Sequence, residues 1–221
     1  MDAAGAAATS STRDIVEEAW RRGRTFDLSR IGYGRIHWGN KADIVSHPFS
    51  YYYFLAGLVN LLGCRRIVEI GTHQGGSALA MAAGLADAAG GRIVTFDITP
   101  DGTARFAGHP VIRAFRLDAN SSAAYEACLA EIGDARIDLV YIDAVHDFWP
   151  TMLSAAVYGL WMRARFLVLD DITLNAGMLR AWTSLRSRFG DDAVDATEIV
   201  PQIRPPSDGT RPGFGFVRLP A

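Results

Sequence analysis

The chain contains the stretch Glu69-Ile70-Gly71-Thr72-His73-Gln74-Gly75-Gly76-Ser77, which joins a short β-branched run to an alanine-rich helical run. Its glycines stand where a backbone turns tightly and approaches a ligand closely. Their spacing does not match G-x-G-x-x-G, so the dinucleotide-binding fingerprint is absent. A zwitterionic amino-acid ligand suits the stretch, because the acid would meet its ammonium group and the serine at the helix N-terminus its carboxylate. The stretch therefore predicts a strand, a ligand-binding turn and a helix.

Short β-branched runs alternate with helical stretches on both sides of this turn. Near-continuous apolar strands separated by helices predict an α/β fold, a parallel sheet with helices on both faces. The chain ends differently, because residues 193–200 and 213–217 flank a Pro- and Gly-rich turn and predict a long antiparallel hairpin. The expected parallel strands are 67–70, 93–97, 111–117, 137–143 and 166–170, and the expected helices are 76–89, 121–132, 149–163 and 175–189.

Each expected parallel strand ends in an acidic residue. Ligands of open α/β sheets bind beyond the carboxyl ends of the strands, so these side chains should converge on one crevice. A single aspartate at such a place usually caps the next helix, but five strand ends in succession favour a shared site. A crevice this negative suits a cation or an array of sugar hydroxyls, and not a pyrophosphate. The acids are Glu69, Asp97, Asp118, Asp143, Asp170 and Asp171.

The residues before the first strand are organised differently. Ser11 or Thr12 can cap a short helix that runs to Arg22. Glycine, aromatic and polar residues dominate 23–49, which predicts an irregular segment that covers the site. Ser50 then caps an apolar helix over 51–62, and Gly63 ends it. The expected divisions are a flexible tail (1–12), a helix with a covering or lid segment (13–49) and the main domain (50–221).

Composition narrows the classes of function. The 221 residues are 49% apolar and 21% charged, which suits one folded domain and excludes a disordered chain. The net charge is −2 and the arginines are scattered, so no nucleic-acid surface is expected. Neither a signal peptide nor a membrane span is evident. Cys64 and Cys128 fit no metal or redox spacing, so we expect buried free thiols in a cytoplasmic protein.

The motif Glu-x-Gly-x-x-x-Gly-x-Ser, Asp97 after the second strand and the closing hairpin together resemble class I S-adenosylmethionine-dependent methyltransferases. The resemblance covers roughly residues 50–218. It is greatest toward the cation-dependent, catechol-type and antibiotic-sugar O-methyltransferases. It implies a Rossmann-like, seven-stranded sheet in the order 3-2-1-4-5-7-6, with strand 7 antiparallel. His73 and Gln74 inside the first turn depart from the family pattern.

The resemblance also implies how S-adenosylmethionine would be held. The turn would hold the methionine end through Glu69, Gly71 and Ser77. Asp97 would bind the ribose, and Asp118 with Ala119 would flank the adenine. The complete set of cofactor-binding residues expected on this basis is Glu69, Gly71, Thr72, Gly75, Ser77, Asp97, Asp118, Ala119 and Asp143.

A second group of residues implies a metal and a base. In cation-dependent O-methyltransferases an aspartate ends strand four, a Lys or His follows three residues later, and an Asp-Asn or Asp-Asp pair ends strand five. The resemblance therefore implies that Asp143, Asp170 and Asp171 ligate Mg²⁺ or a similar divalent cation, while His146 acts as general base and Asp143 takes part in catalysis. Hard oxygen ligands with open positions suit Mg²⁺ independently of the resemblance. The alternative for Asp171 is that it caps the helix that follows.

We therefore expect a metal-dependent O-methyltransferase that acts on a hydroxyl of a small molecule, a catechol or a sugar diol of specialised-metabolite or antibiotic biosynthesis. One alternative is a metal-independent O- or N-methyltransferase, and another is a non-catalytic module that binds S-adenosylmethionine or a nucleotide. We also expect a homodimer formed through the N-terminal segment. Residues that could wall the acceptor pocket, or belong to the core instead, are Trp38, Tyr51, Tyr52, Trp149 and Trp182, and His37 and His47 could reach the site from the covering segment.

Overall fold

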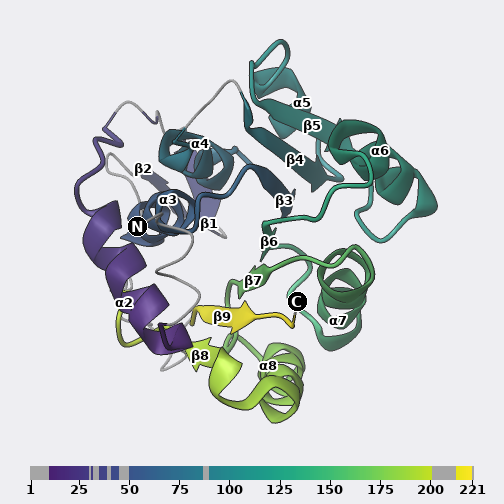
Figure 1. The fold of residues 1–221 in the computed structure, drawn as a ribbon. Helices are drawn as coiled ribbons and strands as arrows, with labels where there is room; N and C mark the ends of the chain where they lie inside the picture. The colour runs from purple at the N-terminus through teal and green to yellow at the C-terminus, as the bar shows by residue number, and fades with distance from the viewer. Residues whose placement is uncertain are drawn as a thin grey trace.

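The fold is that of a computed structural model, which describes residues 10–29, 31, 35–38, 41–44, 50–86, 90–200 and 213–220 (Figure 1). For residues 35–38 and 41–44 only the backbone is described, so nothing follows here for the side chains of His37 and Trp38. His47, most of the expected tail and the turn at 201–212 lie outside the described residues. No helix within the described part of the chain is long and apolar enough to cross a membrane.

Seven strands form the main sheet. They are β3 (Arg66–Ile70), β4 (Arg92–Asp97), β5 (Ile112–Arg116), β6 (Leu139–Ile142), β7 (Phe166–Leu169), β8 (Ala193–Asp195) and β9 (Gly215–Arg218). Their order is β5-β4-β3-β6-β7-β9-β8, with β3 to β7 parallel and β9 antiparallel to both of its neighbours. Numbered within this sheet, the order is 3-2-1-4-5-7-6 with strand 7 antiparallel. The predicted α/β topology is confirmed.

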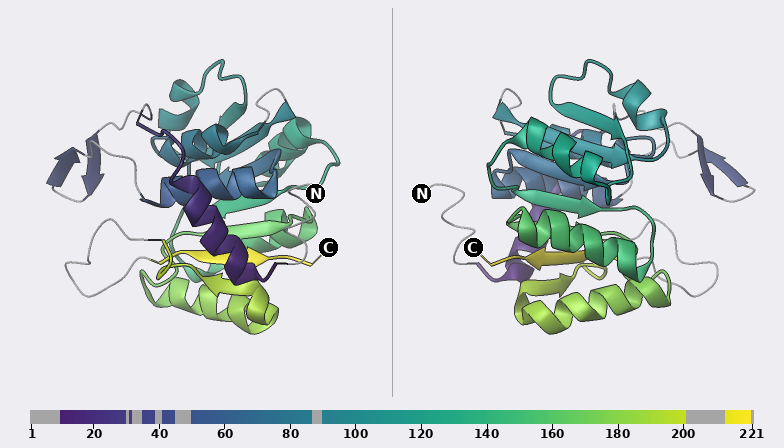
Figure 2. Two further views of the ribbon diagram at one scale, coloured as in Figure 1. Left: turned by 60° about the vertical axis from the view of Figure 1, so that its left-hand side comes forward. Right: turned by 90° about the vertical axis from the view of Figure 1, so that its right-hand side faces the viewer.

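Helices cover both faces of the sheet (Figure 2). They are α2 (Thr12–Gly23), α3 (Ser50–Leu62), α4 (Gly76–Gly84), α6 (Ser122–Ile132), α7 (Phe148–Ser154) and α8 (Ala176–Phe189). Successive residues of a strand point to opposite faces, so β3 contributes Ile67 to one core and Val68 to the other. The first core holds residues of α2, α3 and α4, and the second holds residues of α6 and α8.

The helix expected over 149–163 consists of two segments. After α7, the backbone continues as the π-helix η2 (Ala155–Trp161). The bonds from Met162 N to Val157 O and from Ala164 N to Gly159 O each span five residues, which is the π-helical pattern. A short helix that the sequence analysis missed, α5 (Asp101–Arg105), precedes β5.

Two regions of the chain differ from expectation for local reasons. The final hairpin forms, but β8 stops at Asp195, because the Asp195 carboxylate accepts the Thr197 N–H and turns the chain away from the sheet. The covering segment was expected to be irregular, and this is wrong for part of it. It contains an antiparallel pair, β1 (Arg35–Trp38) and β2 (Lys41–Ile44), in which Trp38 is opposite Lys41. A two-residue connection of turn-favouring sequence, Gly39-Asn40, accounts for this pairing.

The helices α2 and α3 cross at very close range. α2 begins after Ser11, whose hydroxyl accepts the Asp14 N–H, as expected for a cap. A Cβ added at Gly57 of α3 would overlap the backbone of Ala19 and Gly23 in α2. The absence of side chains at Gly57 and Gly23 therefore sets how closely the two helices approach.

Gly57→Ala is expected to destabilise the protein. The added methyl group has no space at the α2–α3 crossing, and overpacking of this kind costs about 1–3 kcal/mol of the free energy of unfolding. Chemical denaturation measures the loss. The control is Thr183→Ala at an exposed position of α8, where the change should stay within about 0.5 kcal/mol. Equal stability of the two variants would contradict the packing described here.

Candidate functional site

A cavity of about 280 Å³ opens beyond the carboxyl ends of β3, β4 and β6 and beside the turn after β5. Its walls include the end of β3, the loops after β4 and β5, and one side of α7. This is the edge of the sheet at which the sequence placed a crevice. The residues predicted for ligand binding that line it are Gly71, Asp97, Asp118, Ala119 and Asp143.

The first turn passes very close to the end of β6. Gly71 has φ +99°, and a Cβ at this position would overlap the carbonyl group of Asp143. Gly75 has φ +75° and precedes α4, with its N–H donated to the Thr72 carbonyl at 2.6 Å. Only glycine adopts these backbone conformations without strain. The glycines therefore let the turn lie between the ligand cavity and the neighbouring strand.

Glu69 lies under this turn and not on the cavity wall. Its carboxylate is fully buried and accepts hydrogen bonds from Ser77 Oγ and Thr95 Oγ1, both at 2.5 Å. The Thr95 hydroxyl also lies 2.6 Å from the Thr72 hydroxyl. Burial raises the pKa of Glu69 to about 8. Glu69, Thr72 and Ser77 thus form one buried network that ties the turn and α4 to the sheet, and their contact with a methionine group stays a prediction.

Asp97 joins the end of β4 to the first turn. Its carboxylate accepts the His73 N–H at 2.7 Å and the Thr99 N–H at 2.9 Å. His73 has φ +41°, a left-handed conformation that few residues other than glycine adopt, and its backbone rather than its imidazole makes this contact. On the next strand end, Asp118 Oδ1 accepts the Asn120 N–H at 2.9 Å. Both carboxylates keep further acceptor capacity toward the cavity.

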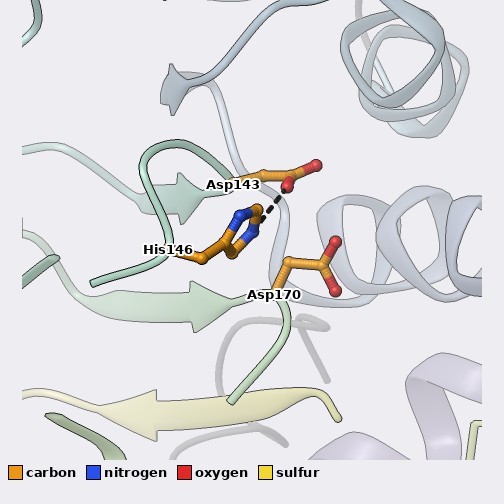
Figure 3. Close-up of side chains that lie close together, drawn as sticks. All are labelled: Asp143, His146 and Asp170. Carbon is orange, nitrogen blue, oxygen red and sulfur yellow. Dashed lines mark ion pairs between the residues drawn. The ribbon is translucent and has the colours of Figure 1, made fainter. Parts of the chain in front are cut away.

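Asp143, His146 and Asp170 come together at the ends of β6 and β7 (Figure 3). One potential ligand atom from each lies within 4.8 Å of the others. His146 Nε2 is 3.4 Å from Asp143 Oδ1, and the other Asp143 oxygen accepts the Tyr141 hydroxyl at 3.0 Å. His146 Nε2 is buried and has no hydrogen-bond partner among the described residues. An unpaired nitrogen that faces two carboxylates has the chemistry of a site for a cation or a transferable proton.

Burial and mutual repulsion act on these acids. Burial, followed by the negative charges of Asp143 and Asp171, raises the pKa of Asp170 well above its ordinary value. Burial alone would lower the pKa of His146, but the nearby carboxylates of Asp143 and Asp171 outweigh it and raise this pKa. A divalent cation would relieve the repulsion between the acids. The residues present therefore fit such an ion.

Asp171 faces His146 and is not part of the converging trio. It has φ +55°, an uncommon conformation for a residue other than glycine, and its carboxylate Oδ2 lies 3.4 Å from His146 Nε2. The alternative that Asp171 caps the next helix is wrong, because the Asn175 side chain caps α8 by accepting the Met178 N–H. Its role as a metal ligand stays a prediction.

Two functional neighbours were missed in the sequence. Tyr141 lies two positions before Asp143 on β6, so strand alternation places both side chains on one side and could have identified it. Asn175 donates its side-chain amide to the His146 carbonyl at 2.7 Å, a contact between distant segments that leaves no signal in the sequence.

Of the aromatic residues expected to wall an acceptor pocket, none of the four whose side chains are described lines the cavity. The rings of Tyr51 and Tyr52 are in edge contact, with 4.5 Å between their centroids. Burial raises the pKa of Tyr51, and the charges of Tyr52, Asp143 and Asp170 raise it further. Trp149 is 74% exposed on α7. Trp182 belongs to the second core, which is the alternative stated for it above.

Comparisons with known proteins show which family and which solved structures the chain is similar to. Residues 68–171, from β3 to just beyond β7, match the family model of a methyltransferase domain. Similar solved structures include cofactor-bound Rv0187 from MTB, with 18% identity, a TM-score of 0.55 and coverage of 93% of this chain and 89% of that chain. TomG from Streptomyces achromogenes, an O-methyltransferase of tomaymycin synthesis solved with S-adenosylmethionine, has 21% identity, a TM-score of 0.54 and coverage of 94% and 90%.

An O-methyltransferase from Bacillus cereus in complex with SAH is similar as well, with 18% identity, a TM-score of 0.51 and coverage of 93% of this chain and 91% of that chain. At these identities the likenesses show the fold. A comparison with curated protein sequences gives no match. The resemblance to class I methyltransferases expected from the first turn, Asp97 and the closing hairpin is confirmed.

Glu69→Gln is expected to flatten the dependence of stability on pH. The pKa of Glu69 is raised from 4.5 to about 8 by burial, so the folded state holds this proton more tightly than the unfolded state does. The wild type should therefore lose stability as the pH rises through this window, and glutamine cannot ionise. Thermal unfolding from pH 4.5 to 8 measures the slope. The matched control is Glu126→Gln at an exposed position, and a variant as steep as wild type would contradict a proton on Glu69.

Proposed function

We propose that this chain, of which residues 68–171 match a methyltransferase domain, transfers the methyl group of S-adenosylmethionine to a hydroxyl oxygen of a small molecule with the help of a divalent cation. The observation that supports this most is the meeting of Asp143, His146 and Asp170 beside a cavity whose wall includes Asp97 and Asp118. A binding module would need the cavity but has no use for an unpaired imidazole between carboxylates.

Different residues of the cavity wall would bind the different parts of the methyl donor. Asp97 would accept hydrogen bonds from the ribose hydroxyls, while Asp118 and Ala119 would lie beside the adenine. The tight turn at Gly71 lets the backbone approach the methionine end. TomG and the Bacillus cereus enzyme, whose structures contain S-adenosylmethionine and SAH, support a donor of this chemistry.

We assign the cation to Asp143 and Asp170, with Asp171 as the third ligand. Asp171 would have to turn its carboxylate away from His146 to join the other two. The hydrogen bond from Tyr141 fixes one oxygen of Asp143 and orients its carboxylate. When bound, a divalent cation lowers the pKa of a hydroxyl group beside it, which makes the oxygen a stronger nucleophile.

His146 is proposed to accept the proton of the acceptor hydroxyl. Its Nε2 faces the cluster without a hydrogen bond, and the carboxylates at 3.4 Å would stabilise the imidazolium that forms. Asn175 holds the His146 backbone in place. The methyl group then moves by in-line displacement, and the chain contributes by holding oxygen, carbon and sulfur in line.

The substrate proposed is a catechol or a sugar diol, since adjacent oxygens can approach the cation together. An origin in specialised or antibiotic metabolism is supported by TomG, which acts in tomaymycin synthesis. The cytoplasmic location and the homodimer through the N-terminal segment stay predictions. Detection of SAH after incubation of the protein with S-adenosylmethionine, Mg²⁺ and a panel of catechols and sugar diols tests the activity. No turnover with any hydroxyl acceptor, but turnover with amines, would favour the N-methyltransferase alternative.

Asp170→Asn is expected to weaken binding of Mg²⁺ or Mn²⁺ by more than about tenfold, because it removes one carboxylate from the cluster. Titration calorimetry measures this directly, with the exposed variant Asp134→Asn as the control of equal charge. Exhaustive chelation should abolish methyl transfer and added Mg²⁺ should restore it. Full activity after chelation would instead support a metal-independent methyltransferase.

His146→Ala is expected to lower the rate of methyl transfer by about 10²–10⁴-fold, the range for loss of a general base. Affinity for S-adenosylmethionine should be retained, because the imidazole does not line the cavity. The control is His109→Asn, near the start of β5, where the imidazole accepts the Val111 and Ile112 N–H groups and its ring contacts Phe106. Unchanged turnover in His146→Ala would remove His146 from the mechanism.

A further inference from the structure

The π-helix η2 and the end of α7 hold the loop between β5 and α6. The Tyr158 hydroxyl donates to the Ala119 carbonyl at 2.6 Å, and the Ser154 hydroxyl donates to Asn120 Oδ1 at 3.0 Å. Both side chains are buried, with exposures of 0% and 2%. Two hydroxyls from one helix thus reach two successive residues of a loop that lines the cavity.

These contacts are not needed to start the next helix. The loop already ends in its own cap, because Ser121 Oγ accepts the Ala124 N–H and begins α6. The Ser121 hydroxyl and N–H also both bond the Asp118 carbonyl, which closes the turn. The bonds from Tyr158 and Ser154 therefore act on the part of the loop that faces the cavity.

The ring of Tyr158 supports the cavity as well. It lies 6.1 Å from the ring of Phe96, which lines the cavity from β4. The hydroxyl stays a donor at all ordinary pH values, because burial raises the pKa of Tyr158. Runs of π-helix are rare and frequently occur at functional sites. Here η2 contains Tyr158, whose hydroxyl bonds the Ala119 carbonyl in the loop between β5 and α6.

We propose that Tyr158 and Ser154 are positioning residues that hold the Asp118–Asn120 loop in the shape that binds the nucleoside part of the methyl donor. Neither residue needs to touch the donor's reacting atoms. The inference rests on the proposed function, since it assigns the nucleoside end of the S-adenosylmethionine site. It predicts that loss of either hydroxyl weakens nucleoside binding and leaves binding of the cation unaffected.

Methylthioadenosine is the probe, because it carries the nucleoside and lacks the amino-acid part. Tyr158→Phe and Ser154→Ala should each bind it about 3- to 10-fold more weakly than wild type, the effect of one lost hydrogen bond that orients a site. The affinity for SAH should fall by a similar factor, while the affinity for Mg²⁺ should not change. Titration calorimetry gives all three values, and thermal unfolding shows whether each variant is folded.

Tyr125→Phe is the matched control. Its ring stacks on Trp161 of the same π-helix at 5.1 Å, but its hydroxyl makes no hydrogen bond among the described residues. Wild-type affinity for methylthioadenosine in both Tyr158→Phe and Ser154→Ala would overturn the inference and leave the proposed function intact. Equal weakening of nucleoside and Mg²⁺ binding would show a general structural role and would also overturn it. A wild-type protein that binds neither SAH nor methylthioadenosine would overturn the proposed function together with the inference.

Discussion

Carboxyl groups gathered at one edge of a parallel sheet repel one another, and most of the site follows from how the chain accommodates this repulsion. Glu69 is fully buried, and burial raises its pKa to about 8. Its two carboxyl oxygens form hydrogen bonds with the hydroxyl groups of Ser77 and Thr95. One carboxylate oxygen of Asp143 accepts the Tyr141 hydroxyl, and the other lies 3.4 Å from His146 Nε2. Asp170 Oδ1 accepts the Asp171 N–H, and burial, followed by the charges of Asp143 and Asp171, raises the pKa of Asp170 well above its ordinary value. The group of Asp143 and Asp170 therefore favours a positively charged ligand.

The need for positive charge matches both of the proposed ligands. The methyl donor carries a sulfonium and an ammonium group, and a divalent cation would carry the charge that Asp143 and Asp170 leave uncompensated. Each of these ligands would favour the ionised form of the acids over the protonated form.

The elements of the sheet could be predicted well because the residue patterns that indicate strands, helices and turns are local in the sequence. Short apolar strands, the helices between them and the closing hairpin indicated the α/β class, the resemblance to class I methyltransferases implied the order of the seven strands, and β3 with its glycine turn lies where expected. The hairpin β1–β2 was missed because the aromatic and glycine content of its surroundings resembles a loop. The π-helix was missed because five-residue bonds at Val157 and Gly159 have no distinct composition.

Only the parts of the site that lie at the ends of neighbouring strands could be predicted from the sequence. Asp143 and Asp170 meet because β6 and β7 are neighbours, which the strand order implies. The orientation of Asp171 toward His146 depends on a left-handed backbone that the sequence does not reveal. The contact between Asn175 and His146 joins segments 29 residues apart, and Tyr158 reaches Ala119 across 39 residues. Such bonds arise from packing and cannot be derived from spacing.

One continuous segment connects the two ends of the site. It begins with Asp143 and His146, starts α7 at the Asp147 cap, and ends in the π-helix that carries Tyr158. The segment therefore places the proposed base just before α7 and, in η2, a hydroxyl that bonds the loop proposed to hold the nucleoside. The position of the proposed base and the shape of the proposed nucleoside site thus both depend on how this one segment packs on the sheet.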